Sequence, residues 1–151
     1  MAMGRRRRLT QTDYQALAEL RFLLRQFSAF SSAAANEAGL PAQQHQALLA
    51  IKGTAEGEAM TVGHLAARLL IAPHSAAELV KRLEEAGYAA VSTDANDRRR
   101  HVLALTGKAE AVLETLSGAH LNEIRDLAPL LVEALTTLTA GSADRPTGGR
   151  G

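Results

Sequence analysis

The stretch from Thr61 to Thr106 constrains the fold most, because it contains two short amphipathic helices followed by a hairpin. The first helix places apolar residues at i, i+3, i+4 and i+7, namely Val62, Leu65, Ala66 and Leu69. The second repeats the stripe with Ala76, Leu79, Val80 and Leu83. We expect Thr61 to N-cap the first helix, Pro73 to begin the second at N1, and Gly87 to end it at C′. Two helices joined by a turn of about three residues form a helix-turn-helix.

A two-stranded hairpin with an arginine-rich tip is predicted after the helix pair. The expected strands cover residues 88–93 and 100–105, and the turn covers residues 94–97. That turn is rich in Asp and Asn, which bond their own backbone and favour tight turns. A short strand edge is also expected at Ala59 and Met60, beside the hairpin. A helix-turn-helix followed by such a hairpin is a winged helix.

The resemblance to a known family rests on two segments, LAARLLIAPHSAAELVKRLEEAG and DANDRRRHVLALT. These resemble the core of the multiple antibiotic resistance regulator (MarR) family. The wing pattern of that family, D-x-R and then an apolar strand ending in L-T, matches Asp97, Arg99, Leu105 and Thr106. Looser similarity continues upstream in LPAQQHQALLAI and downstream in AHLNEIRDLAPLL. The resemblance implies a transcriptional regulator of double-stranded DNA, with a small-molecule effector that weakens DNA binding.

Long helices are predicted on both sides of the winged helix. Thr10 and Asp13 form a T-x-x-D capping box at the start of a helix over residues 10–38. Its two apolar stripes contain Leu17, Leu20, Leu24 and Phe27, and Ala16, Leu23 and Phe30. Thr106 should N-cap a second helical region over residues 107–140. Helices this apolar need burial on more than one side, so a homodimer through both helices is expected.

Two prolines are expected to shape the helices. Pro41 should begin a helix at N1 that runs to about Gly53. Pro129 should break the last helical region near Ala128 and leave a short closing helix.

Composition and length favour one mainly helical domain over residues 1–151. The resemblance implies that its DNA-binding core covers residues 41–106. Hydrophobic residues make up 46% of the chain but aromatic ones only 3%, so the core must be aliphatic. The absence of cysteine excludes a disulfide framework. Since no apolar run approaches about 18 residues, we expect a cytoplasmic protein without a membrane partner.

Charge is distributed unevenly although the net charge is only +1. Residues 1–8 carry +4 and residues 61–108 carry +2, whereas residues 9–60 carry −2 and residues 109–151 carry −3. This asymmetry is typical of a modest nucleic-acid footprint. The GRRRR segment within residues 1–9 is either a basic arm that contacts phosphates or a solvated flexible terminus. Residues 141–151 are expected to be a flexible tail.

The second helix of the motif is the predicted recognition helix, with its first turn and outer face in the major groove. Its expected DNA-binding residues are His74, Ser75, Ala77, Glu78, Lys81 and Arg82. His74 and Ser75 suit base edges, and Lys81 and Arg82 suit phosphates or guanine, although Arg82 can also be partly structural. Glu78 either accepts from cytosine N4 or pairs with Lys81 or Arg82 along the helix, and we favour the pairing.

The wing adds Arg98, Arg99 and Arg100 to the expected DNA-binding residues. The family resemblance implies that Arg99 enters the minor groove, where arginine reads shape. Asp97 is expected to shape the wing by accepting backbone or arginine hydrogens. The alternative is that the arginines form a solvated charge run.

No pattern in the sequence predicts a catalytic or metal site. The five histidines, His45, His64, His74, His101 and His120, show no i, i+4 pairing, and no phosphate-loop or hydrolase motif is present. We therefore expect no enzyme activity and no cofactor. Tyr14, Phe22 and His45 either line an effector cleft or are packing residues. The rival function is a winged-helix protein-interaction module that does not bind DNA.

Overall fold

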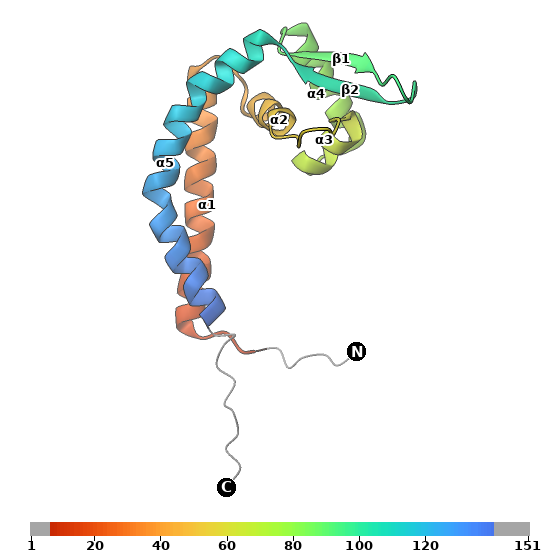
Figure 1. The fold of residues 1–151 in the computed structure, drawn as a ribbon. Helices are drawn as coiled ribbons and strands as arrows, with labels where there is room; N and C mark the ends of the chain where they lie inside the picture. Colours follow the sequence, from red (N-terminus) through yellow and green to blue (C-terminus); the bar gives the residue numbers. More distant parts are fainter. Residues whose placement is uncertain (1–6, 141–151) are drawn as a thin grey trace, which may run out of the picture. The chain divides into compact units, whose positions relative to one another are not determined.

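The computed structural model describes residues 7–140, which form five helices and one two-stranded sheet (Figure 1). In chain order these are α1 (Gln11–Glu37), α2 (Ala42–Lys52), α3 (Val62–Leu69), α4 (Pro73–Glu85), β1 (Ala89–Thr93), β2 (His101–Leu105) and α5 (Gly107–Ala140). The prediction of a mainly helical winged helix-turn-helix with long terminal helices is confirmed. Most of the predicted GRRRR arm and the whole predicted tail lie outside the described residues.

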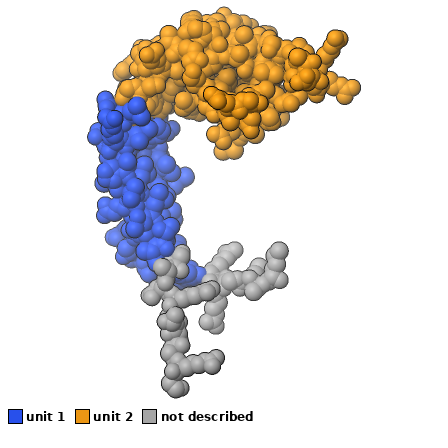
Figure 2. Space-filling view, in the orientation of Figure 1, with its two compact units in different colours: residues 1–30, 121–151 blue, residues 31–120 orange. Residues whose placement is uncertain are grey.

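The chain separates into two compact units (Figure 2). One contains residues 1–30 and 121–151, and the other contains residues 31–120. The first is a helical pair in which α1 and α5 run side by side in opposite directions (Figure 1). The second is the winged helix, and it also contains the end of α1 and the first part of α5.

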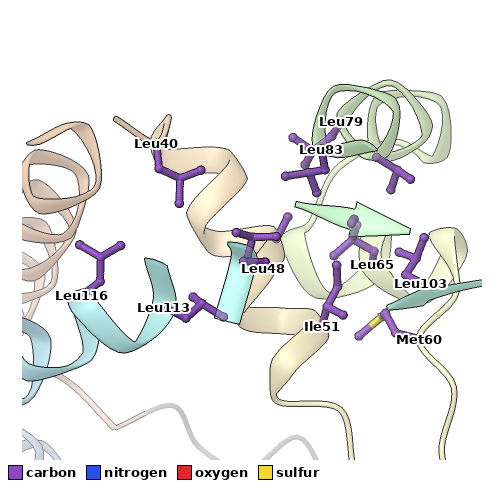
Figure 3. Close-up of a cluster of buried hydrophobic side chains, with 14 residues drawn as sticks. Leu40, Leu48, Ile51, Met60, Leu65, Leu79, Leu83, Leu103, Leu113 and Leu116 are labelled. Carbon is purple, nitrogen blue, oxygen red and sulfur yellow. The ribbon is translucent and has the colours of Figure 1, made fainter. Parts of the chain in front are cut away.

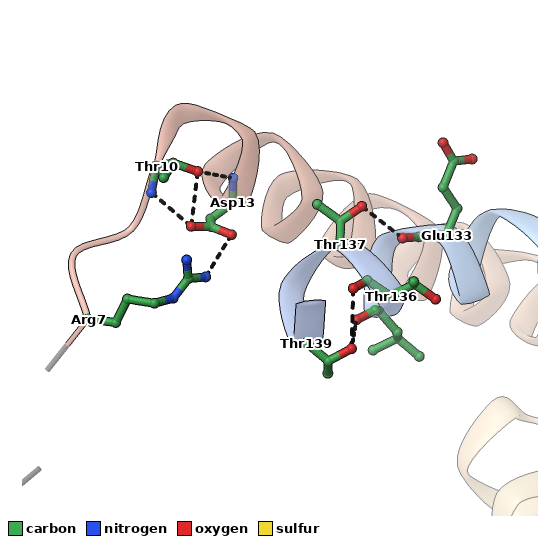
Figure 4. Close-up of polar contacts among 8 residues, drawn as sticks. Arg7, Thr10, Asp13, Glu133, Thr136, Thr137 and Thr139 are labelled. Atoms are coloured by element: carbon green, nitrogen blue, oxygen red, sulfur yellow. Dashed lines mark hydrogen bonds and ion pairs between the residues drawn. The ribbon is translucent and has the colours of Figure 1, made fainter. Parts of the chain in front are cut away.

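A capping box begins α1, as predicted (Figure 4). The Asp13 backbone N–H donates to Thr10 Oγ1 at 3.2 Å, and the Thr10 backbone N–H donates to Asp13 Oδ2 at 2.8 Å. Arg7 Nη2 donates to Asp13 Oδ1 at 2.9 Å. The Thr10 backbone hydrogen bond and the Arg7 contact hold the pKa of Asp13 below its usual value.

Helix α5 is continuous through Pro129, so the predicted break near Ala128 is wrong. Proline removes one hydrogen bond to the carbonyl of Arg125, but both residues are exposed and water can satisfy that carbonyl. Leu127 and Ala134 are buried on either side of the proline. Apolar packing therefore holds both halves in one helix, against the local preference of the sequence.

The core of the winged helix is aliphatic (Figure 3). Its fully buried leucines come from the segment before α2, from α2, from α3 and from α4, and are Leu40, Leu48, Leu65 and Leu83. Both predicted helix stripes face this core, which also takes Leu103 from β2 and Leu113 and Leu116 from α5. Each fully buried leucine stabilises the unit by roughly 1.5–3 kcal/mol.

The predicted ends of the motif helices are confirmed. Thr61 accepts the His64 backbone N–H at 3.2 Å, Pro73 occupies N1 of α4, and Gly87 follows α4 with φ +78°. Pro41 differs from its prediction by one residue, since it is the N-cap of α2 and not N1. Its ψ of 142° keeps it extended, while its carbonyl accepts the His45 N–H at 3.0 Å.

The sheet pairs β1 with β2 in antiparallel register, from Ala89 opposite Leu105 to Thr93 opposite His101. Each strand begins one residue later than predicted. The predicted strand edge at Ala59 and Met60 is also shifted, because the isolated bridge joins Thr61 to Val102. Met60 still contributes, since its carbonyl accepts the Leu103 N–H at 2.8 Å. The segment before α3 is thus tied to the wing.

Leu70 gives a stability prediction for the turn between α3 and α4. It adopts left-handed φ 56° and ψ 41°, and its side chain is 92% exposed. Leucine is strained in this conformation and glycine is not. We expect Leu70→Gly to raise the free energy of unfolding by about 0.5–1 kcal/mol in urea titrations, because the relieved strain outweighs the extra unfolded-chain entropy. Leu70→Ala keeps the strain and should give no gain; equal stability of both variants would contradict the strain argument.

Candidate nucleic-acid interface

The two faces of α4 differ in burial as the sequence predicts. Ala76, Leu79, Val80 and Leu83 are buried. On the other side His74, Ala77, Glu78, Lys81 and Arg82 are exposed, and Ser75 is half-buried. Ala72 is the N-cap of α4, and no side chain in the part of the chain that the structure describes caps its first turn. The helix therefore presents an open polar face that begins with uncapped backbone donors.

Glu78 does not form the ion pair that we favoured from the sequence. Within residues 7–140, no carboxylate of α4 lies within ion-pair distance of Lys81 or Arg82. Exposed helical pairs contribute only about 0.3–0.5 kcal/mol, which is too little to hold long side chains in one place. The Glu78 carboxylate is thus left on the open face.

The arginines of the wing lie in its tip and not on a strand. Arg98, Arg99 and Arg100 are all exposed and precede β2. The alternation of side chains between the two faces of a strand therefore does not determine the directions of these three side chains. Figure 1 shows this tip projecting beyond α3 and α4 of the same unit.

Carboxylates organise the backbone of the tip. The Arg99 N–H donates to Asp97 Oδ1 at 3.0 Å, and the Asn96 N–H donates to Asp94 Oδ1 at 2.9 Å. Arg100 Nη1 lies 4.0 Å from Asp94 Oδ2, and the Arg100 carbonyl accepts the Asp94 N–H at 2.9 Å. The tip is a hydrogen-bonded turn from which the guanidinium groups of Arg98 and Arg99 extend into solvent.

A basic concavity lies between the wing and the start of α3, and it was not predicted from the sequence. It has a volume of about 620 Å³ and is lined by Thr61, Val62, Gly63, His64, Arg99, Arg100 and His101. The positive end of the α3 dipole and two arginine residues of the wing border it. The concavity is therefore suited to an anionic group. The sequence predicted the start of a helix at Thr61. It could not predict that the wing lies beside this helix start, because that depends on tertiary contacts.

His45, which is buried, and His120, which is half-buried, form a ring pair within the winged-helix unit. Their ring centroids are 5.1 Å apart, and His45 is only 4% exposed. Since a carbonyl only accepts, His120 Nδ1–H donates to the Leu116 carbonyl at 2.8 Å, and His120 Nε2 is hydrogen-bonded to Ser31 Oγ at 2.8 Å. Nδ1 of His45 is buried and has no hydrogen-bond partner among residues 7–140. Burial, and then the charge of His120, lower the pKa of His45.

The three residues considered for an effector cleft do not share one compact unit. Tyr14 and Phe22 are exposed on α1 in the helical pair, whereas His45 is buried on α2 in the winged helix. Across residues 7–140, no group of three or more His, Asp or Glu side chains is arranged to hold a metal ion. None of the helices described is long and apolar enough to span a membrane.

Comparison with protein families and solved structures agrees with this geometry. Residues 38–100 match the model of the MarR family, which confirms the resemblance over the winged-helix core. A comparison with curated proteins finds no match.

Solved structures share the fold at low sequence identity. AbsC from Streptomyces coelicolor, a MarR family transcriptional regulator, is 21% identical with a TM-score of 0.70, covering 91% of this chain and 93% of its own. An S. aureus MepR mutant bound to an oligodeoxyribonucleotide is 18% identical with a TM-score of 0.61, and the coverages are 89% and 99%. CouR from Rhodococcus jostii RHA1, bound to p-coumaroyl-CoA, is 18% identical with a TM-score of 0.67, and the coverages are 93% and 100%.

The buried histidine gives a pH prediction. Because the pKa of His45 is lower in the folded state than its unfolded value of 6.5, protonation favours unfolding. The contribution of His45 to stability is complete above pH 6.5 and is lost as the pH falls through the lowered pKa. We expect the free energy of unfolding to be smaller at pH 5.5 than at pH 7.5 in urea titrations.

His45→Leu should reduce this pH dependence, while His74→Gln, a change at an exposed histidine, should leave it unchanged. An identical pH dependence in the His45→Leu protein would contradict the assignment.

Proposed function

We propose that this chain, whose residues 38–100 match the model of the MarR family, is a transcriptional regulator that binds double-stranded DNA. The observation that carries the proposal is that one compact unit holds both the open polar face of α4 and the arginine-rich wing tip. A winged helix uses these two elements to reach the major and minor grooves. A similar fold binds an oligodeoxyribonucleotide in the MepR mutant structure.

Helix α4 is proposed to read the major groove. His74 and Ser75 in its first turn meet base edges, while Lys81 and Arg82 contact phosphates or guanine. Ala77 lies between them and allows close approach. The unpaired Glu78 favours acceptance from cytosine N4, because no helical ion pair occupies its carboxylate.

The wing is proposed to add charge and shape recognition. Arg99 enters the minor groove and Asp97 holds the tip backbone through its bond to the Arg99 N–H. Arg98 and Arg100 contact the phosphate backbone. The concavity between the wing and the start of α3 is suited to one phosphate of the DNA backbone beside the wing.

A homodimer is proposed because the helical pair exposes much apolar surface. Its exposed large hydrophobic residues are Tyr14, Leu17, Phe22 and Leu24 on α1, and Leu121, Ile124, Leu130, Val132 and Leu135 on α5. A monomer rarely leaves so many large apolar side chains in water, and a two-fold mate would cover them on both chains. A two-fold dimer would then bind a near-palindromic operator.

Control by a small molecule is proposed from the solved structures of similar fold. CouR is bound to p-coumaroyl-CoA, and 6-hydroxynicotinic acid regulates DNA binding by BpsR from Bordetella bronchiseptica. By analogy this chain is a cytoplasmic repressor whose effector weakens DNA binding. We propose no enzyme activity and no bound cofactor for it.

The proposed wing contact predicts a salt-dependent phenotype. After binding sites are selected from a random DNA pool, we expect Arg99→Ala to weaken binding to selected and scrambled DNA alike. The slope of log K against log salt should fall by about one for each phosphate charge that a subunit no longer neutralises. Fluorescence anisotropy at three salt concentrations measures both quantities.

Two comparisons sharpen this test. His74→Ala should instead relax preference at particular base pairs, and removing a well-formed hydrogen bond to a base should cost about 1–3 kcal/mol. Arg125→Ala, an exposed change on α5, should alter neither affinity nor slope. If wild-type protein shows no salt-dependent DNA binding, the protein-interaction module becomes the better explanation of the fold.

The proposed dimer predicts that Leu24→Glu disrupts self-association. Placing a carboxylate in an apolar interface costs several kcal/mol unless it is paired, so the variant should sediment as a monomer at micromolar concentration. Gln26→Glu adds the same charge on nearly the opposite face of α1 and should leave the dimer intact. A wild-type protein that is monomeric at that concentration would refute the dimer.

A further inference from the structure

A second cavity in the winged-helix unit lies behind the wing. It has a volume of about 330 Å³ and is lined by the end of α2, residues 54–60, strand β2 and the start of α5. It is separate from the basic concavity, since the two share no lining residue. The volume is at the lower end of the range for small-molecule sites.

The lining combines an apolar floor with charged groups. Ile51, Met60 and Leu103 belong to the buried core and contribute the floor, and Figure 3 shows these three side chains grouped together. Lys52 Nζ and Glu110 Oε2, both half-exposed, are 2.7 Å apart. Exposed ion pairs of this kind contribute little to stability, so a ligand can displace this one.

The net charge of the cavity lining favours a cationic ligand. Lys52, Glu58 and Glu110 supply one ammonium and two carboxylates, which leave one net negative charge. Lys52 pairs with Glu110, and no cation between residues 7 and 140 forms an ion pair with Glu58. A cation with an apolar body fits both the floor and the uncompensated carboxylate.

We propose that this cavity binds a small organic cation with an apolar body and that its occupancy weakens DNA binding through the wing. The effect on DNA binding rests on the proposed function. Residues 102–105 of β2 form one wall, and the Met60 carbonyl opposite accepts the Leu103 N–H at 2.8 Å. A ligand bound against both segments shifts the pairing that fixes the wing beside α3. Coupling between sites typically changes affinity by about 5–150-fold.

The binding test uses 4-phenylbutylammonium and the full chain without DNA. Calorimetric titration should give a Kd of about 0.1–1 mM, as expected for a ligand of this size. The neutral analogue 4-phenylbutanol should bind at least about fivefold more weakly, because it lacks the charge that Glu58 attracts. Equal binding of the ammonium and the alcohol would overturn the proposal.

Matched variants locate the site. Glu58→Gln should weaken ammonium binding at least about threefold, whereas Glu56→Gln, two residues away and outside the cavity, should not. Ala104→Leu places a larger side chain at an exposed lining position and should block both ligands. Unchanged binding in both Glu58→Gln and Ala104→Leu would place the ligand elsewhere and refute the site.

The coupling test adds selected operator DNA. Saturating 4-phenylbutylammonium should lower DNA affinity at least about fivefold in wild type and not in Ala104→Leu, with tetramethylammonium at equal concentration as the ionic-strength control. Ammonium binding without this change would overturn the coupling. Failure of the unliganded protein to bind DNA would instead refute the proposed function, because the site is measured without DNA.

Discussion

The architecture of the winged helix depends on burying one apolar stripe of α4. Leu79 and Leu83 are held in the same core as Leu48 of α2 and Leu65 of α3. Rotating α4 about its axis would expose these leucines, at roughly 1.5–3 kcal/mol each. The polar face therefore keeps one orientation without any ion pair of its own. The backbone of this face is held by the core behind it, and its outer side chains are exposed.

Hydrogen bonds at the base of the wing hold the hairpin in place relative to α4. Thr106 Oγ1 donates to the Gly87 carbonyl at 2.6 Å, and the Thr106 N–H donates to the Tyr88 carbonyl at 3.1 Å. Lys108 Nζ donates to the Ala86 carbonyl at 2.7 Å and lies 4.5 Å from the centroid of the Tyr88 ring. The left-handed Gly87 makes the sharp exit from α4 that these bonds require. Thr106 also accepts the Ala109 N–H at 3.3 Å, so one residue joins α4, the wing and α5.

Local physics explains which features the sequence could predict. Caps at Thr10, Thr61 and Thr106 and the apolar stripes of α3 and α4 depend on neighbours a few residues away, and all of these are confirmed. The prediction at Pro129 is wrong because burial on both sides of it outweighs one missing hydrogen bond. The concavity beside the wing and the His45–His120 pair could not be predicted, since both join segments far apart in the sequence. The residues of α4 were placed on one face correctly, but their contacts with DNA stay predictions.

The two compact units differ in how complete their cores are. The winged helix contains four of the five largest fully buried side chains, whereas the helical pair contributes only Leu23. Leu127 is also buried in that pair, but its other buried apolar residues, Ala16 and Ala134, are small, and many of its larger apolar side chains are exposed. Small residues let two helices approach closely but bury little area, so this unit gains little stability by itself. Covering its apolar surface by a second copy would therefore add stability mainly where the chain has least.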